Sequence, residues 1–217
     1  MAQAILAQGH TCTRQLHKLG VSSTCSMRST GIACLAAVFL ISTVVDKSWT
    51  FLRSANVKLR SKITEDEVLA AQKGWGDALV SISTTYEAQG FAAAKALAEQ
   101  VIDSAYGYNY GPVLFKPTLA GGSQTFRTTR EGALAYFVGG DPSFPKDTGF
   151  ALKGWRKVEI VNSAIFREGN IAVTVGNVLI TDKSGAVTKV DKTWAFFKGR
   201  DRKLRIVAHH SSLPYEA

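Results

Sequence analysis

Four long segments of β-strand character follow one another directly at the end of this 217-residue chain. They run from Trp155 to Phe166, Ile171 to Thr181, Val187 to Phe197 and Lys203 to Ser212. The connections between them are short and rich in Gly, Asn and Asp, which is typical of tight turns between neighbouring antiparallel strands. The sequence therefore predicts an antiparallel meander that makes up the second half of a domain.

The residues before the meander predict mainly helices. Thr64-Glu-Asp-Glu67 forms a capping box, in which Thr64 caps a helix and Glu67 reaches back to the Thr64 amide. The further elements that we expect are a first helix to about Gln89, a second from Phe91 to about Ala105, short strands at Val113–Phe115 and Gln124–Arg127, and a short helix from Glu131 to Val138 capped by Thr128 or Thr129. Helices first and a sheet afterwards indicate an α+β fold, and a strongly curved antiparallel sheet wrapped around a helix would leave a pocket at its open end.

The first 45 residues differ in composition from the rest. No acidic residue precedes Asp46, and an apolar run of 14 residues extends from Ile32 to Val45. That run is short for a membrane span and suits the apolar core of a signal peptide, although an uncleaved anchor is the alternative. We expect residues 1–45 to be a signal or transit peptide, 46–62 a linker and 63–217 the working domain, exported or imported to the periplasm, a thylakoid lumen or a plastid.

Charge and cysteine content narrow the function of that domain. Residues 1–60 contain seven Lys or Arg and one acid, whereas residues 61–217 contain 19 Lys or Arg and 16 acids. Because the domain is only mildly basic and has no arginine-rich run, we expect no nucleic-acid binding, and no membrane contact once the targeting segment is removed. Cys12, Cys25 and Cys34 all precede the domain, so it has no thiolate for a zinc site or a nucleophile.

The final strand carries an unusual polar cluster, His209-His210-Ser211-Ser212. Neighbouring side chains of a strand point to opposite faces, so the two histidines cannot readily bind one metal ion, and the domain has no third histidine. Strict alternation would place Arg205, Val207, His209 and Ser211 on one face, and Leu204, Ile206, Ala208, His210 and Ser212 on the other. The cluster is either the wall of a polar pocket or a solvated edge strand.

No nucleotide-binding glycine motif is present, and Ser211 and His209 do not suggest a catalytic triad. Side chains two positions apart on one face of a strand are separated by roughly 7 Å, which is too far for a direct hydrogen bond. Thr118 follows Pro117 and can be explained as turn chemistry, and Tyr136 can be explained as a core aromatic residue.

The order of elements and the ending Arg205-Ile-Val-Ala-His-His-Ser-Ser-Leu-Pro214 resemble the NTF2-like superfamily. Within it, the chain is most similar to the iota-class carbonic anhydrases, which are relatives of the association domain of calcium/calmodulin-dependent kinase II. The resemblance covers about Ile63 to Pro214. It implies an NTF2-like cone and reversible hydration of CO2 to bicarbonate without a metal or another cofactor, and it also implies a homodimer.

The same resemblance implies that Thr118, Tyr136 and Ser211 supply pocket hydroxyls, with the two histidines beside them. We expect these hydroxyls to hold the attacking water and to stabilise the bicarbonate-like charge. His209 shares a predicted face with Ser211 and would move the proton, whereas His210 and Ser212 would contact the substrate less directly.

Two alternatives remain open at this point. One is a non-catalytic oligomerisation or ligand-binding module, weakened because the chain has no kinase portion. The other is an isomerase or cyclase, which would need an acidic base facing into the cone. Asp77 is the nearest candidate for that base, and the helical spacing favours a surface position for it.

Overall fold

A computed structural model describes residues 62–216 of the chain. The expected targeting segment at residues 1–45 lies outside the described residues, as does all of the expected linker except Lys62. Within the described part, no helix combines the length and the apolar character that crossing a bilayer requires.

The predicted helices are confirmed. They are α2 (Glu65–Gln89), α3 (Phe91–Ala105) and α4 (Arg130–Val138). The capping box forms as expected: the Thr64 hydroxyl accepts a hydrogen bond from the Glu67 amide, and the Glu67 carboxylate accepts one from the Thr64 amide. Thr129, rather than Thr128, caps α4 by accepting from the Gly132 amide. Two short 3₁₀ helices, η1 (Gly122–Gln124) and η2 (Phe150–Leu152), lie on either side of α4 in the chain.

The sheet has five strands in the order β1-β5-β4-β3-β2. Their bounds are β1 (Leu114–Lys116), β2 (Trp155–Glu168), β3 (Ile171–Asp182), β4 (Val187–Lys198) and β5 (Leu204–Ser212). The predicted meander is confirmed, since β2 to β5 pair antiparallel in sequence order. The sheet is mixed rather than antiparallel throughout, because β1 pairs parallel with β5. The chain between β1 and β5 contains α4 and three whole strands, and this long connection lets β1 join the free edge of β5 in either direction.

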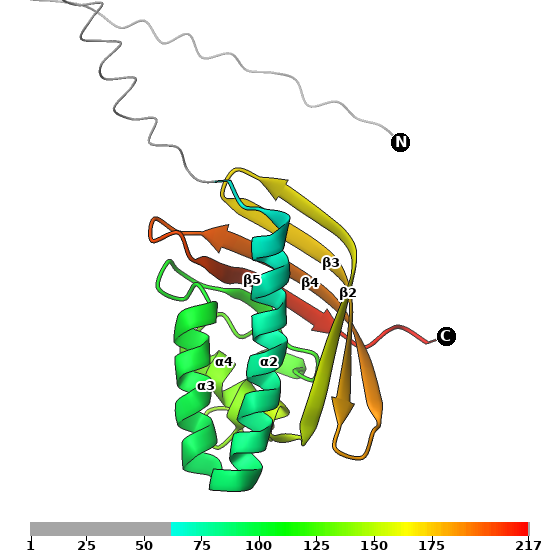
Figure 1. Cartoon of the computed structure of the whole chain (residues 1–217). Helices are drawn as coiled ribbons and strands as arrows, with labels where there is room; N and C mark the ends of the chain where they lie inside the picture. Colours follow the sequence, from blue (N-terminus) through cyan, green and yellow to red (C-terminus); the bar gives the residue numbers. More distant parts are fainter. Residues whose placement is uncertain (1–61, 217) are drawn as a thin grey trace, which may run out of the picture. The chain divides into compact units, whose positions relative to one another are not determined.

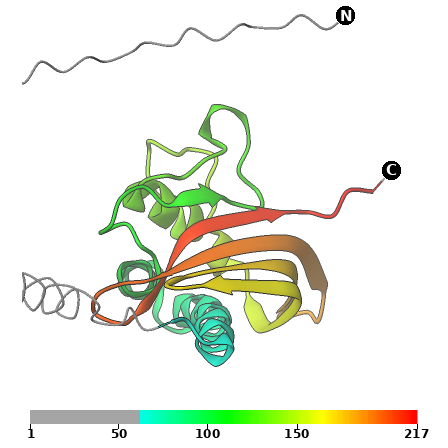
Figure 2. The same cartoon turned by 90° about the horizontal axis from the view of Figure 1, so that it is seen from above.

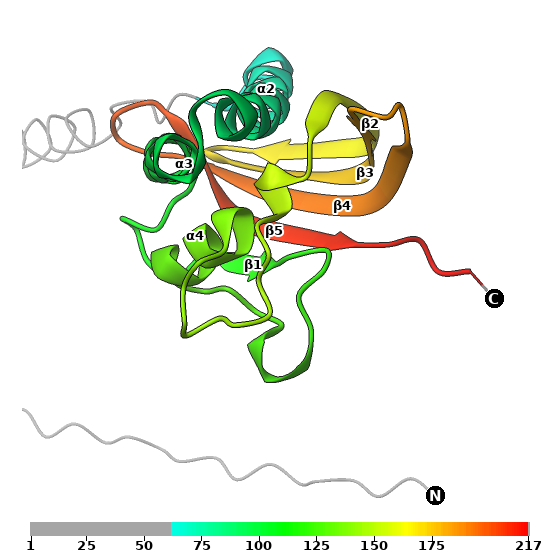
Figure 3. The same cartoon turned by 90° about the horizontal axis from the view of Figure 1, so that it is seen from below.

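The helices pack on this curved sheet in the way expected of an NTF2-like α+β domain (Figure 1). Helix α2 packs against β2 and α3, while α3 also contacts α4 and β5. The bend of the long strands is visible from above (Figure 2), and α4 lies near β1 at the β5 end of the sheet (Figure 3). The buried core between helices and sheet is rich in aromatic side chains, among them Trp75, Tyr106, Phe115, Trp194 and Phe196.

An irregularity between Asn162 and Ala164 in β2 contributes to the bend. Gly176 of β3 lies against it, and a Cβ atom at this position would be 2.1 Å from the Val161 carbonyl oxygen. Only glycine fits this close approach of two backbones. Bulges of this kind increase local twist and bend the strand that carries them.

The predicted strand at Gln124–Arg127 was wrong, because η1 and an irregular segment occupy these positions. One backbone hydrogen bond joins this segment to β1, from the Arg127 amide to the Phe115 carbonyl. The Arg127 side chain is buried, donates to both carboxylate oxygens of Asp147 and lies over the Phe144 ring. The segment is thus positioned by one buried ion pair rather than by a strand ladder.

Candidate active site

The inward face of β5 differs from the one predicted by simple alternation. The pairing with β4 shifts between Ala195 and Phe196, so that Val207 is an extra residue on β5. As a result Ile206, His209 and Ser211 are all buried, although alternation placed Ile206 opposite the other two. The extra residue forms a β-bulge, and beyond it the side chains that would otherwise point to the opposite face from Ile206 point to the same face. This brings His209 and Ser211 into the interior.

Three hydroxyl groups from different elements lie close together at the end of β5. The Thr118 Oγ1 and Ser211 Oγ atoms are 2.6 Å apart, joining the segment after β1 to β5. Thr118 and the backbone of Leu119 are also polar neighbours of the Tyr136 hydroxyl on α4. The structure thus brings together Thr118, Tyr136 and Ser211, which we call the hydroxyl cluster.

Tyr136 is only 5% exposed, and its hydroxyl has no hydrogen-bond partner among the described residues. Burial raises the pKa of this phenol above its usual value, so the group remains a neutral donor. Its ring packs against Phe115, Phe137 and Phe150. A buried hydroxyl without a partner costs about 1–3 kcal/mol, and such a group in a pocket is available to a ligand.

His209 occupies the middle of a buried chain of polar groups. Its Nδ1 atom lies 2.9 Å from the Tyr106 hydroxyl, which also accepts a hydrogen bond from the Trp75 indole N–H at 3.0 Å. Its Nε2 atom lies 2.9 Å from the Lys192 Nζ atom. We call Trp75, Tyr106, His209 and Lys192 the relay.

The environment of His209 restricts what its ring can do. The side chain is only 1% exposed and stacks on Phe115 with ring centroids 4.6 Å apart. Burial, followed by the neighbouring Lys192 and His210, lowers the pKa of His209 well below its usual value. A ring that stays neutral does not store a proton, but it can pass one between its two nitrogens.

His210 and Ser212 are not part of this interior site. His210 is exposed and Ser212 is half-buried, and both line a groove of about 370 Å³ together with Asn177 and Asp191. They lie on the opposite face of β5 from His209 and Ser211, so the structure separates them from the hydroxyl cluster. A substrate-binding role for them stays a prediction.

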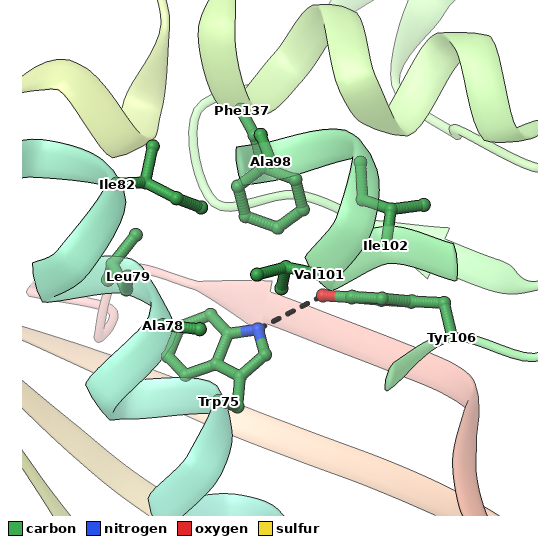
Figure 4. A pocket seen from close by; sticks show the side chains of 9 residues that line it. All are labelled: Trp75, Ala78, Leu79, Ile82, Ala98, Val101, Ile102, Tyr106 and Phe137. Atoms are coloured by element: carbon green, nitrogen blue, oxygen red, sulfur yellow. Dashed lines mark hydrogen bonds between the residues drawn. The ribbon is translucent and has the colours of Figure 1, made fainter. Parts of the chain in front are cut away.

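A small apolar cavity lies between α2 and α3, next to the relay (Figure 4). Its volume is about 10 Å³, and Leu79, Ile82, Ile102 and Phe137 are among the side chains that line it. The Tyr106 hydroxyl and the Trp75 indole face each other at its border. A space of this size holds one molecule as small as water, and its apolar lining gives water few partners.

Three members of the relay were missed by sequence reasoning. Tyr106 lies in a Tyr/Gly-rich stretch that is typical of a turn after a helix, and Trp75 lies at a helical spacing that is typical of a core residue. Lys192 did leave a signal, because it alternates with the buried Val190 and Trp194 along β4. A lysine at an inward position of a strand is unusual, since this residue is rarely fully buried without a partner.

Metal-ligating side chains do not gather anywhere in residues 62–216: no three His, Cys, Asp or Glu residues come within reach of one ion. Asp77 was the candidate for the acidic base of an isomerase or cyclase. It is exposed and forms a salt bridge with Lys73 on the surface of α2. The chemistry of the interior is therefore that of hydroxyl, imidazole and amine groups surrounded by aromatic rings.

Fold and site together define a class of small α+β domains whose curved, helix-covered sheet encloses a neutral polar site. Comparison with known proteins identifies the particular family. The family model described as metal-independent carbonic anhydrase matches residues 66–213. The chain is 71% identical over 154 residues to a metal-independent carbonic anhydrase of Nostoc sp. (strain PCC 7120), which covers 71% of this chain and 75% of the relative.

One solved structure agrees with this match. A cyanobacterial iota-carbonic anhydrase complexed with bicarbonate superimposes with a TM-score of 0.72 at 69% identity, covering 74% of this chain and 98% of that one. A putative calcium/calmodulin-dependent kinase II association domain from Xanthomonas campestris is more distant, with a TM-score of 0.45 at 24% identity over 74% of this chain and 95% of that one. The chain belongs to the metal-independent carbonic anhydrase family.

Proposed function

We propose that the chain catalyses the reversible hydration of CO2 to bicarbonate at the hydroxyl cluster. The observation that carries this proposal is the convergence of Thr118, Tyr136 and Ser211, with the Tyr136 hydroxyl buried and without a hydrogen-bond partner in residues 62–216. The 69% identical cyanobacterial enzyme, whose structure contains bicarbonate, supports the same reaction. Family membership also disfavours a non-catalytic oligomerisation module.

The hydroxyl cluster suits the two demands of this reaction. CO2 is small and apolar, and the rings of Phe115, Phe137 and Phe150 provide an apolar wall beside Tyr136. As water attacks the carbon, negative charge develops on the CO2 oxygens, where hydroxyl donors stabilise it. A neutral phenol and two aliphatic hydroxyls supply such donors without titrating near neutral pH.

Activity is expected to survive exhaustive chelation, because the side chains of the hydroxyl cluster do not need a metal to act. The test is to dialyse the full chain against EDTA and dipicolinate and to measure CO2 hydration by stopped-flow. The rate should stay within about twofold of the untreated protein and below that of zinc enzymes, whose metal lowers the pKa of the bound water. Complete loss of activity that one added metal restores would contradict the metal-free reaction.

The chain is also expected to form a homodimer through the outer face of the sheet. Phe166, Val161 and Val175 are 64%, 58% and 48% exposed, respectively, and the strand register places all three on the outer face of β2 and β3. Apolar side chains gathered on one sheet face are typical of an interface. Light scattering should give twice the mass of one chain, and a Val175→Glu variant should give the single mass. A monomeric parent chain would contradict this assembly.

The N-terminal composition supports export or organelle import. Residues 1–45 contain no acid and end in the apolar run from Ile32 to Val45. Sequencing the N-terminus of the protein purified from its host should find a start well after Met1. An intact N-terminus in the cytosolic fraction would overturn this proposal.

A further inference from the structure

Lys192 is a buried lysine that has no acidic partner in the part of the chain that the structure describes. It is only 4% exposed, and its Nζ atom lies 4.6 Å from the Trp75 ring centroid and 5.3 Å from that of Trp194. Lys198, the other buried lysine on the same face of β4, binds the Glu67 carboxylate at 2.5 Å. No salt bridge of Lys192 exists within residues 62–216, so no carboxylate there compensates a charge on this amine.

The hydrogen bonds of the relay fit a neutral amine. The Trp75 indole can only donate, so it donates to the Tyr106 oxygen, and the Tyr106 hydroxyl is free to donate to His209 Nδ1. A neutral imidazole that accepts at Nδ1 carries its proton on Nε2, from which it donates to Lys192 Nζ. Only a neutral amine has the lone pair to accept this bond, and the donors of Trp75, Tyr106 and His209 are then all used.

Protonation of Lys192 would reverse the relay. An ammonium group must donate to Nε2, and the His209 proton then moves to Nδ1 and points at the Tyr106 oxygen. That oxygen would accept two hydrogen bonds, and its own proton would have no partner in the relay. The relay therefore has two states, and the charge of Lys192 selects between them.

Lys192 also lies next to the hydroxyl cluster. It is the direct cross-strand partner of Ser211, and both side chains point to the interior. Cβ atoms of such partners are about 4.5–5.5 Å apart. The Lys192 side chain therefore starts beside Ser211, and its amine reaches His209, two residues from Ser211 on the same strand.

We propose that Lys192 takes up the proton that CO2 hydration releases and so becomes the counter-ion of the bicarbonate formed beside Ser211; this rests on the proposed function. In the step, the water oxygen forms a bond to the CO2 carbon, one C=O electron pair moves onto oxygen, and one water O–H bond breaks; Lys192 gains the proton on the lone pair that it withdraws from the His209 Nε2–H bond. The site begins with neutral CO2, water and amine and ends with bicarbonate and ammonium. Its net charge stays constant, which avoids burying a lone anion among aromatic rings.

The surroundings of Lys192 support this role. Burial lowers its pKa to about 7, so the amine can gain and lose a proton near neutral pH. The titratable groups facing the site are Tyr106, Tyr136 and His209, and burial keeps all three neutral. Lys116 follows the inward-facing Phe115, so it lies on the other face and donates to the Ser211 carbonyl.

The first test compares the pH profiles of the full chain and a Lys192→Met variant, measured by ¹⁸O exchange between CO2 and water. A neutral amine is the proton acceptor, so the parent rate of hydration should rise with pH through about 7. The variant should be about 10²-fold slower at pH 8 and flat between pH 6 and 8.5. Lys198→Met is the matched control, since it removes a buried lysine of the same strand face that is far from the site, and it should keep the parent profile.

The second test needs no substitution. In the full chain labelled with ¹⁵N-histidine, nitrogen chemical shifts distinguish the two neutral forms of His209. At pH 8.5 its proton should be on Nε2, and saturating bicarbonate should move it to Nδ1. A Lys192→Met variant that keeps the parent pH profile would overturn the inference. The inference would also be overturned if bicarbonate shifted the signals around Tyr136 but left the His209 proton on Nε2. An inactive parent chain that binds no bicarbonate would instead defeat the proposed function itself, and this inference with it.

Discussion

A Tyr136→Phe variant is expected to hydrate CO2 about 10²- to 10³-fold more slowly than the parent chain, as for other losses of one oxyanion donor. The substitution keeps the ring packed against Phe115 and Phe150 and removes only the hydroxyl. Since that hydroxyl is buried without a partner, its loss should leave the free energy of unfolding equal or slightly higher. A slower enzyme that is no less stable would separate a catalytic role from a structural one.

Tyr108→Phe is the matched control for this experiment. Tyr108 is a half-buried tyrosine, and its hydroxyl donates to the Arg127 carbonyl rather than facing the cluster. Its removal should cost about 0.5–1.5 kcal/mol of stability and leave the stopped-flow rate unchanged. If Tyr136→Phe matched the parent rate, Tyr136 would have no part in the chemistry.

Asp147→Ala is expected to destabilise the domain by about 3–5 kcal/mol, the usual cost of breaking a buried ion pair. Arg127 and Asp147 have side chains only 3% and 6% exposed, and the carboxylate accepts both hydrogen bonds from one guanidinium nitrogen. Removing the carboxylate leaves a buried charge without compensation. The measurement is urea unfolding followed by tryptophan fluorescence.

Asp103→Ala provides the comparison on the surface. The Arg130–Asp103 pair has equally good geometry but is 34% and 58% exposed, so its loss should cost at most about 1 kcal/mol. Equal effects of the two substitutions would show that burial does not set the strength of the Arg127–Asp147 pair. Asp147 lies in the loop that follows α4, the helix that carries Tyr136. The Asp147→Ala substitution should therefore also lower the rate of CO2 hydration, because it disturbs the position of Tyr136.

Local rules predicted the regular elements well. The capping box at Thr64, the break at Gly90 and the turns between the four long strands depend on residues a few positions apart, so their bounds could be inferred to within a few residues. The prediction of a strand at Gln124–Arg127 was wrong because the structure of this segment does not depend on nearby residues. Its place depends on Asp147, which is 20 residues away, and no local pattern encodes that contact.

Several residues of the site were also predicted from the sequence. Thr118, Tyr136, Ser211 and His209 came from a family resemblance, and the structure brings the three hydroxyls together and places His209 two residues from Ser211. Alternation alone misplaced Ile206, because the extra residue Val207 changes which side chains face inward. A bulge is a property of two paired strands, and it is hard to infer from one of them.

The linear order of residues was sufficient for the helices, the meander and the absence of a third histidine in the domain. Tertiary structure alone decided that β1 runs parallel to β5, which face of β5 is buried, and that Lys192 contacts His209 and pairs with no acid among the described residues. The physical reason is the range of the interactions. Caps and turns act over a few residues, whereas burial and the pKa of an amine depend on every element packed around it.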